Sequence, residues 1–420
     1  MANLVHLIHR FPPATGGAEI AASMVCRDQI RNGHSVRVET TTALHPDSFF
    51  LPGSEILPAG VSFLEGIQVH RHALWRFPLQ RPLLAVCQRI APLALRPWLG
   101  WYSPIAPTMC RLALQEDFAP DLAIGWALPH GSILASACRL AKACKIPLVL
   151  IPLLHPGNPN RANCPIRRAF LRPELLGLLA QADLLLALTD WEAETLASHG
   201  LNRSRISVTG LGIDSNSVTG GNRLNFRKRL NILGEKTKVI GHLATLSPEK
   251  GTLDLLAARA RIPGDNLVVV LAGLGNRAFQ RRLEPFRKAS WLRQTGPLDT
   301  LEKKDFFAGI DLFCLPSIAD AWSLTLLEAW SAGVPAVVYN AGGPGALVRH
   351  GIDGWKVEPG NVSALAETLS KASANPEILQ QMGALGKTRA KNTLTWPNAL
   401  ERIDLAIRPL LKTKTPGSIN

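Results

Sequence analysis

The stretch that decides the fold reads Leu315-Pro-Ser-Ile-Ala-Asp-Ala-Trp-Ser-Leu-Thr-Leu-Leu-Glu-Ala-Trp-Ser-Ala-Gly-Val-Pro335. It predicts a buried strand that ends at Leu315, a loop that runs to about Ser323, and a helix that continues to Ala332. Glu328 falls in the apolar part of this helix, where a carboxylate needs a polar partner. Amides at the helix start can bind an anion, and the carboxylate can accept hydrogen bonds from a diol such as ribose. The stretch therefore indicates a nucleotide site, with a solvated or capping acid as the alternative.

Strand and helix patterns alternate on both sides of this stretch. Short apolar runs predict strands at 4–8, 35–40, 122–124, 148–153, 184–188, 238–243, 267–272, 312–315 and 335–339. Helical patterns lie between or after them at 132–144, 192–199, 251–260, 326–332 and 362–373. This alternation predicts an α/β protein of two doubly wound, Rossmann-like domains, whose ligands lie beyond the carboxyl ends of the strands. We place the boundary near residues 209–218, which gives domains of 1–210 and 211–395.

The chain is strongly basic. Its 420 residues carry a formal net charge of +14, with a pI near 9.8, and such a balance attracts anions in general. No nucleic-acid-binding module is recognisable, so we expect no nucleic-acid partner. The seven cysteines include no Cys-x-x-Cys pair, which argues against a disulfide framework or a structural zinc site. The first residues do not resemble a signal peptide and no apolar run is long enough to span a membrane, so we expect a cytoplasmic protein.

The stretch 66–115 differs from the rest of the chain. It contains no Asp or Glu and has six arginines, which are interleaved with Trp75, Phe77, Trp98, Trp101 and Tyr102. A basic, aromatic and amphipathic segment can dock on an anionic membrane surface. Such docking would make the protein peripheral on the inner face of the cytoplasmic membrane. The alternative is a helical excursion of the first domain that packs on itself.

Two other junctions between a strand and a helix carry residues suited to phosphate. Gly16 and Gly17 lie at one of them, where glycine lets backbone amides approach a phosphate or a sugar closely. This turn lacks the third glycine of a dinucleotide fingerprint, and a Gly-Gly turn that opens a helix is also a common structural feature. Lys250 lies at the other junction and can hold a diphosphate as a point charge. A solvated lysine in the first helical turn is the alternative.

Taken together, these strings resemble the signature of retaining glycosyltransferases of family 4. That family has a Pro-Ser-x-x-Glu-Gly-Phe-Gly-Leu-x-x-Leu-Glu-Ala pattern followed by a Gly-x-Pro-Val strand. The chain keeps these positions of the pattern: Pro316, Ser317, Leu324, Leu327, Glu328, Ala329, Gly333 and Pro335. The resemblance extends in the same order to Gly16-Gly17, Gly212-Ile213-Asp214, Lys250-Gly251, Gly273-Leu-Gly275, Asp311 and Gly342-Gly343. It implies the GT-B architecture, in which two Rossmann-like domains face each other across a cleft and clasp a nucleotide-sugar donor.

The resemblance also implies which residues bind the donor. Glu328 is expected to hold the ribose hydroxyls, and the backbone amides of Ser323 and Leu324 are expected to face the diphosphate. Gly16 and Gly17 join this donor-binding set from the first domain, which is otherwise expected to bind the acceptor. A last helix over 396–420 is expected to cross back to that domain.

A catalytic group of three side chains is implied as well. Lys250 is expected to neutralise the leaving phosphate, and Asp320 stands where the family has a glutamate that contacts the donor sugar. His155 resembles the family's active-site histidine near that sugar, although a lone histidine after a strand is often structural. No protein nucleophile, metal or cofactor is expected, because helix amides and a lysine can stabilise the charge on a departing nucleotide diphosphate.

Three positions depart from the family pattern. Thr245, which we keep among the donor-binding residues, stands where the family often has arginine, so one positive charge near the diphosphate is missing. Asp320 is one methylene shorter than glutamate, and Ala321-Trp322-Ser323 replaces Gly-Phe-Gly. The donor is expected to be a UDP- or GDP-sugar, and the acceptor a glycan or lipid-linked molecule of cell-envelope or exopolysaccharide synthesis. The rivals are a sugar-nucleotide epimerase or phosphorylase of the same fold, and a degenerate member that acts as an assembly or regulatory partner.

Overall fold

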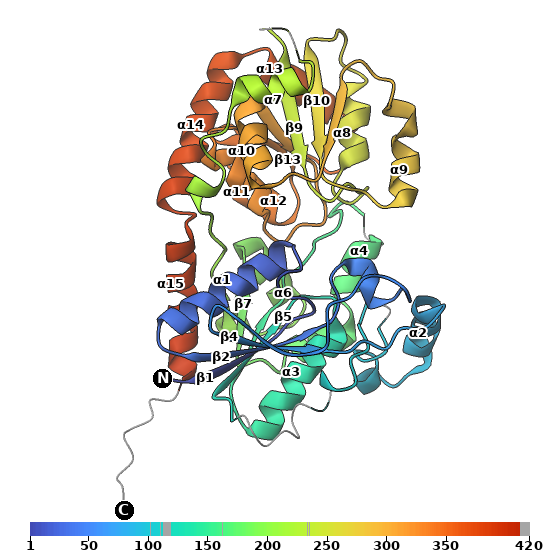
Figure 1. Ribbon diagram of the computed structural model, residues 1–420, viewed down its shortest axis with the longest axis vertical. Coiled ribbons are helices and arrows are strands. Elements are labelled where there is room, and N and C mark those ends of the chain that lie inside the picture. Colours follow the sequence, from blue (N-terminus) through green and yellow to red (C-terminus); the bar gives the residue numbers. More distant parts are fainter. Residues whose placement is uncertain are drawn as a thin grey trace, which may run out of the picture. The chain divides into compact units, whose positions relative to one another are not determined.

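The computed structural model of the protein describes residues 1–100, 102–109, 111, 119–161, 163–232, 234 and 236–411 (Figure 1). The chain forms two compact units. The first contains Met1–Leu154, Arg168–Thr209 and the chain from Leu400 onward, and the second contains His155–Arg167 and Gly210–Ala399. This division differs from the expected domains at a point that matters for the site, because His155 belongs to the second unit.

The first unit is built on a largely parallel sheet. Its strands are β1 Asn3–Leu7, β2 Ser35–Thr41, β3 Gly60–Leu64, β4 Ile67–His72, β5 Leu122–Trp126, β6 Leu148–Ile151, β7 Leu184–Ala187 and β8 Ile206–Val208. Within the described residues they lie in the order β3-β4-β2-β1-β5-β6-β7-β8, and β3 runs antiparallel to β4 while the other pairs are parallel. The central strand β5 is buried along its whole length, as expected for a parallel strand covered on both faces of the sheet.

Helices flank this sheet. They are α1 Gly17–Arg31, α2 Gln80–Ile90, α3 Gly131–Cys144, α5 Pro173–Leu179 and α6 Asp190–Ser198, with short turns η1 Pro46–Phe49, η2 Leu93–Leu95, η4 Arg203–Arg205 and η7 Arg408–Leu410. The boundary between the units falls within α4 Pro165–Phe170 and α15 Trp396–Ile407. The helix α1 packs against β2 and β4, and α3 packs against β1, β5 and β6.

The last helix is shorter than expected. It ends at Ile407, and 412–420 of the predicted 396–420 helix lie outside the described residues. Its second half belongs to the first unit, where Ile403 and Ile407 are buried and Arg402 Nε donates to the carbonyl oxygen of Thr209 at 2.7 Å.

The second unit is built on a parallel sheet. Its strands are β9 Lys238–Leu243, β10 Leu267–Ala272, β11 Leu292–Gly296, β12 Leu312–Leu315, β13 Ala336–Tyr339 and β14 Gly354–Val357. The part of the chain that the structure describes gives the order β11-β10-β9-β12-β13-β14. Each neighbouring pair is parallel, so the carboxyl ends of the strands all lie at the same edge of the sheet.

The helices of this unit are α7 Arg223–Arg229, α8 Thr252–Arg259, α9 Arg277–Leu283, α10 Thr300–Gly309, α11 Leu324–Ser331, α12 Gly342–Leu347, α13 Val362–Ser373 and α14 Pro376–Asn392, with turns η5 Ser215–Ser217 and η6 Glu284–Phe286. A capping box starts α10, because Asp299 Oδ1 accepts the N–H of Glu302 at 2.8 Å and Glu302 Oε2 accepts the N–H of Asp299 at 3.2 Å. This fixes the first turn of α10, which carries Lys303. The core joins Leu255 and Leu256 of α8 to the buried faces of the strands.

The structure confirms the predicted α/β class and corrects one segment. The stretch 66–115 is not a helical excursion from its beginning, since Ile67–His72 form β4 inside the sheet and Ile67 and Val69 are fully buried. Trp101, Cys110 and 112–115 lie outside the described residues. The six cysteines that the structure describes are free thiols, and none of the described helices is long and apolar enough to cross a membrane.

Candidate active site

The loops after β9 and β12, together with the helix α11 that follows the second loop, hold most of the residues predicted for the site. The two strands are neighbours in the sheet, so their carboxyl ends bring the loops together. Gly251, with a φ of +70°, allows a close approach, because a Cβ atom there would lie 2.0 Å from the carbonyl oxygen of Pro316. Ile318 N donates to the carbonyl oxygen of Glu249 at 2.9 Å and fastens one loop to the other.

Lys250 and Asp320 form an ion pair across these loops. Lys250 Nζ also donates to the carbonyl oxygen of Ala319 at 3.3 Å. The two side chains are only 23% and 17% exposed, so each charge compensates the other away from bulk water. Asp320 Oδ2 is buried and has no hydrogen-bond partner among the described residues, which leaves an acceptor for a polar ligand.

His242 supports both loops, although nothing in the sequence pattern singles it out. Its Nδ1 must donate to the carbonyl oxygen of Cys314 at 2.8 Å, because a carbonyl oxygen only accepts. In the neutral ring, Nε2 therefore accepts from Thr252 Oγ1 at 3.0 Å. Burial lowers the pKa of His242 to about 4, so the ring stays neutral at pH 7. One side chain thus ties the end of β9 to the end of β12 and to the first turn of α8.

The helix α11 starts directly after the loop that carries Asp320. Ser323 is its N-cap, with a φ of +94°, and its Oγ accepts the N–H of Leu326 at 3.3 Å. The amides of Ser323, Leu324 and Thr325 have no acceptor within the helix and can bind an anion. Gly343 N donates to the carbonyl oxygen of Asp320 at 2.9 Å and so fixes this loop against α12.

Glu328 lies on the buried side of α11 and has an ionic partner. Nζ of Lys303, on α10, lies 2.8 Å from Glu328 Oε1. Burial raises the pKa of Glu328, and the charge and hydrogen bond of Lys303 oppose that rise. Glu328 Oε2 is buried without a hydrogen-bond partner in the described part of the chain, as is Nε1 of Trp322. The sequence gives no sign of Lys303, which is separated from Glu328 by 25 positions and lies on another helix.

His155 lies close to the Lys250–Asp320 pair within the second unit. A Cβ atom at Gly342 would lie 2.5 Å both from the carbonyl oxygen of Asp320 and from Cγ of Pro156, the residue after His155. Burial first, and then the Lys250 ammonium, lower the pKa of His155 to about 4, against the opposing effect of the Asp320 charge. The imidazole is therefore neutral at pH 7 and can exchange a hydrogen bond with a sugar hydroxyl.

The remaining predicted residues are Gly16 and Gly17 in the first unit and Thr245 on the loop that also carries Lys250. Gly16 and Gly17 begin α1 in the first unit, where a Cβ atom at Gly16 would meet the carboxylate of Glu19. That buried carboxylate is paired with Arg10 Nη2 at 2.7 Å. Thr245 is exposed on the loop after β9. No set of three or more His, Cys, Asp or Glu side chains that could hold a metal ion occurs among the residues the structure describes.

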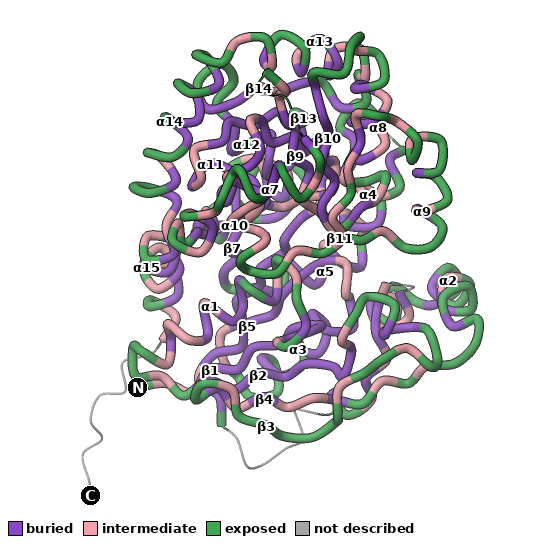
Figure 2. Tube along the Cα trace, turned by 45° about the horizontal axis from the view of Figure 1, so that its top comes forward, coloured by how far each residue is buried: buried purple, intermediate pink, exposed green. Residues whose placement is uncertain are grey.

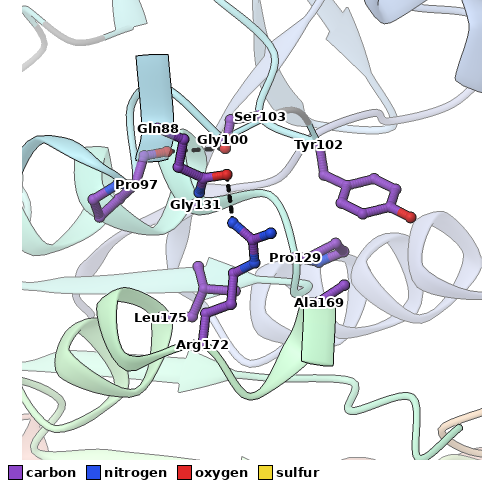
Figure 3. A pocket seen from close by; sticks show the side chains of 10 residues that line it. All are labelled: Gln88, Pro97, Gly100, Tyr102, Ser103, Pro129, Gly131, Ala169, Arg172 and Leu175. Carbon is purple, nitrogen blue, oxygen red and sulfur yellow. Dashed lines mark hydrogen bonds between the residues drawn. The ribbon is translucent and has the colours of Figure 1, made fainter. Parts of the chain in front are cut away.

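A small crevice in the first unit contains none of the predicted site residues. Its lining is shown in Figure 3: Gln88, Pro97, Gly100, Tyr102, Ser103, Pro129, Gly131, Ala169, Arg172 and Leu175. The guanidinium of Arg172 and the amide of Gln88 face each other there and are hydrogen-bonded. The crevice thus marks the contact of α2 with the segment before α5.

Two Rossmann-like units, the second with an acid on the buried side of α11, define the GT-B class of fold. Two family models match the chain: a "glycosyl transferase 4-like domain" over residues 16–212 and "glycosyl transferases group 1" over residues 223–389. The chain belongs to the group 1 glycosyltransferases, which are the family 4 of the sequence resemblance.

Curated relatives agree with this assignment, and solved structures share the fold. The chain is 27% identical to D-inositol 3-phosphate glycosyltransferase of Thermobifida fusca over 248 residues, which cover 56% of this chain and 57% of that protein. The chain spans about half the length of the curated relatives it matches. Its fold is similar to that of HepE from Anabaena in complex with UDP and glucose, with a TM-score of 0.69, 18% identity, and coverage of 97% and 100% of the two chains. Sucrose-phosphate synthase from Thermosynechococcus elongatus gives a TM-score of 0.73 at 15% identity, with coverage of 98% and 99%.

Proposed function

We propose that the protein is a retaining glycosyltransferase that moves a sugar from a UDP- or GDP-sugar to a glycan or a lipid-linked acceptor. The observation that carries this proposal is the meeting of Lys250, Asp320 and His155 beside the start of α11. A cation, a carboxylate and a neutral imidazole stand next to amides that can bind phosphate. Family membership and the names of the relatives support the same chemistry.

In the proposed reaction, binding of the donor breaks the ion pair between Lys250 and Asp320. Lys250 leaves Asp320 for the diphosphate, whose oxygens also accept from the amides of Ser323 and Leu324. Asp320 and His155 then face the hydroxyls of the sugar. Glu328 accepts hydrogen bonds from the ribose diol, with its charge held by Lys303.

The chemistry needs no protein nucleophile, metal or cofactor in this proposal. The bond between the anomeric carbon and the phosphate oxygen breaks, and a bond from the acceptor oxygen forms on the same face of the sugar. The acceptor proton passes to the departing phosphate oxygen, so atoms and charge balance and the anomeric configuration is retained. Lys250 and the helix amides stabilise the negative charge that develops on the leaving group.

The proposed setting is the cytoplasm, in the synthesis of a cell-envelope glycan or an exopolysaccharide. The experiment incubates the protein with UDP- and GDP-sugars and a membrane extract as the source of acceptors, and it measures released nucleoside diphosphate. Release that depends on the extract supports the proposal. Conversion of the donor into another sugar nucleotide without extract, seen by chromatography of the nucleotides, would instead identify an epimerase, and no conversion of any donor would contradict transfer.

A degenerate member that serves as an assembly partner is the second candidate. Two observations favour it: Thr245 leaves the diphosphate one charge short, and Asp320 already neutralises Lys250. Such a protein would bind neither UDP nor GDP. A thermal-shift panel separates the candidates, because a ligand at 100 times its Kd adds about 2.7 kcal/mol to the stability of the native state.

A further inference from the structure

The helix α2 turns its polar side chains inward. Its buried positions are Gln80, Leu84 and Gln88, so the inner face carries one leucine between two glutamines. Gln88 Nε2 donates to Glu174 Oε1 at 3.0 Å, and its Oε1 accepts from Arg172 in the crevice of Figure 3. An ordinary surface helix packs its apolar stripe inward and shows polar residues to water. The amphipathic pattern of α2 is therefore inverted.

The outer face of α2 is a continuous apolar stripe. It consists of Leu79 at the N-cap, Leu83, Val86 and Ile90, which are 75%, 51%, 57% and 81% exposed. At about 100° per residue, these four positions fall within an arc of roughly 60°. In Figure 2, α2 lies at the margin of the first unit and is drawn mainly in the colour of exposed residues. The segments next to it expose further large apolar side chains: Trp75, Phe77, Leu93 and Leu95. Scattered exposed apolar residues are ordinary, whereas a contiguous patch marks an interaction surface.

The charges around this α2 stripe are positive. Arg89 is exposed and lies three residues from Val86, about 60° around the helix axis, so it flanks the stripe. Arg81 is exposed on the same helix but lies roughly on the side opposite the stripe, with its guanidinium 5.2 Å from the ring centre of Phe50, so Arg89 is the arginine of α2 that borders the stripe. The sequence has no Asp or Glu between 66 and 115. An apolar stripe bordered by arginine and free of acids complements a surface that is both apolar and negatively charged.

We propose that the α2 stripe docks the first unit on an anionic lipid bilayer. Leu79, Leu83, Val86 and Ile90 enter the boundary between headgroups and acyl chains, and Arg89 remains among the phosphate groups. The helix then lies in the plane of the interface and does not cross it. The inference is independent of the proposed function, because the binding requires neither donor nor acceptor.

The test is flotation of the full chain with vesicles of phosphatidylcholine alone and of equal parts phosphatidylcholine and phosphatidylglycerol. The protein is expected to float with the anionic vesicles and to be released at high salt. Leu83→Ser combined with Ile90→Ser is expected to lower binding by about tenfold or more, and Arg89→Glu to lower it for anionic vesicles. Leu224→Ser with Leu301→Ser is the matched control, since these leucines are 78% and 72% exposed in the second unit.

The outcomes are distinguishable. Equal binding of wild type and the Leu83/Ile90 variant would overturn the proposal, as would an equal loss in the control. Self-association that the double substitution abolishes, seen by size-exclusion chromatography with light scattering, would assign the stripe to a second copy of the chain. Unchanged melting and unchanged UDP or GDP affinity of the variant separate loss of docking from misfolding and from failure of the proposed function.

Discussion

Nζ of Lys303 lies 2.8 Å from Oε1 of Glu328, the carboxylate that the family pattern assigns to the donor ribose. Glu328 is only 10% exposed, and its burial raises the pKa of the carboxyl group. The ammonium of Lys303 counters this rise and favours the ionised form. An ionised carboxylate only accepts hydrogen bonds, which suits a diol that donates two of them. We interpret Lys303 as a positioning residue that prepares Glu328 for the nucleotide.

Replacing Lys303 by methionine removes this counter-charge while keeping much of the side-chain length. We expect Lys303→Met to weaken UDP or GDP binding by about tenfold near pH 7, because Glu328 takes up a proton more readily without the lysine. The affinity of the variant should then increase as the pH is raised, and that of the wild type should change little. Calorimetric titration of the nucleotide at several pH values measures both effects.

The control for this experiment is Lys371→Met. Lys371 Nζ lies 2.6 Å from Glu367 Oε1 in an exposed pair on α13, and such pairs contribute little. An equal loss of affinity in both variants, or the same pH profile in Lys303→Met and wild type, would show that Lys303 does not act through Glu328.

Glu328→Ala and Lys250→Ala test the assigned contacts with the donor. Each substitution is expected to lower turnover by about two orders of magnitude, the usual cost of losing one charge-stabilising contact. Initial rates of nucleoside diphosphate release measure it, with Glu367→Ala as a control for removing an exposed carboxylate. Full activity in both site variants would disprove the site assignment.

A substitution at Thr245 is expected to strengthen nucleotide binding. The residue is exposed on the loop after β9, where the family often carries arginine. Thr245→Arg should add one cation near the diphosphate and tighten UDP or GDP binding by roughly threefold to tenfold, with less effect at high salt. Thermal shifts across a nucleotide series follow the change. If affinity stays the same or falls, the diphosphate lies elsewhere or the charge is supplied by another residue.

The buried histidine beneath the loops predicts an acid-sensitive second unit. The pKa of His242 is about 4 in the folded protein and about 6.5 in the unfolded chain, so the unfolded state binds the proton first. The free energy of unfolding should therefore fall as the pH drops from about 6.5 towards 4, by about 2 kcal/mol from this residue between pH 7 and pH 5. In His242→Gln, urea unfolding should show a correspondingly smaller loss. An identical loss in wild type and variant would mean that His242 does not titrate in this way.

The central strands could be predicted from sequence almost residue by residue. Lys238–Leu243, Leu267–Ala272 and Leu312–Leu315 are apolar runs covered on both faces, and their observed ends match the expected ones. The edge strands escaped prediction for a physical reason. Gly60–Leu64 is exposed along most of its length and Gly354–Val357 is half-buried, so neither shows a continuous apolar run.

Within the site, the local sequence pattern predicts individual residues, whereas the tertiary packing determines their ion-pair and hydrogen-bond partners. Lys250 and Asp320 lie on loops that follow a strand, and Glu328 is an acid within an apolar helix, which are local features. Lys303 pairs with Glu328 from another helix, and His242 binds the carbonyl oxygen of Cys314 on another strand. These contacts join segments that are distant in the sequence, so a local sequence pattern cannot predict them. His155 was expected in the first domain because its strand belongs there, yet the chain crosses to the second unit directly after Leu154.

In our proposal, the loop and helix from Pro316 to Glu328 bind the diphosphate and ribose of a nucleotide sugar. Calorimetric titration of UDP and of GDP into the wild type and into Glu328→Ala tests it most directly. We predict that the wild type binds one of the two nucleotides at a single site and that Glu328→Ala binds it at least about tenfold more weakly. Equal affinity in the two proteins, or no binding of either nucleotide to the wild type, would contradict the claim.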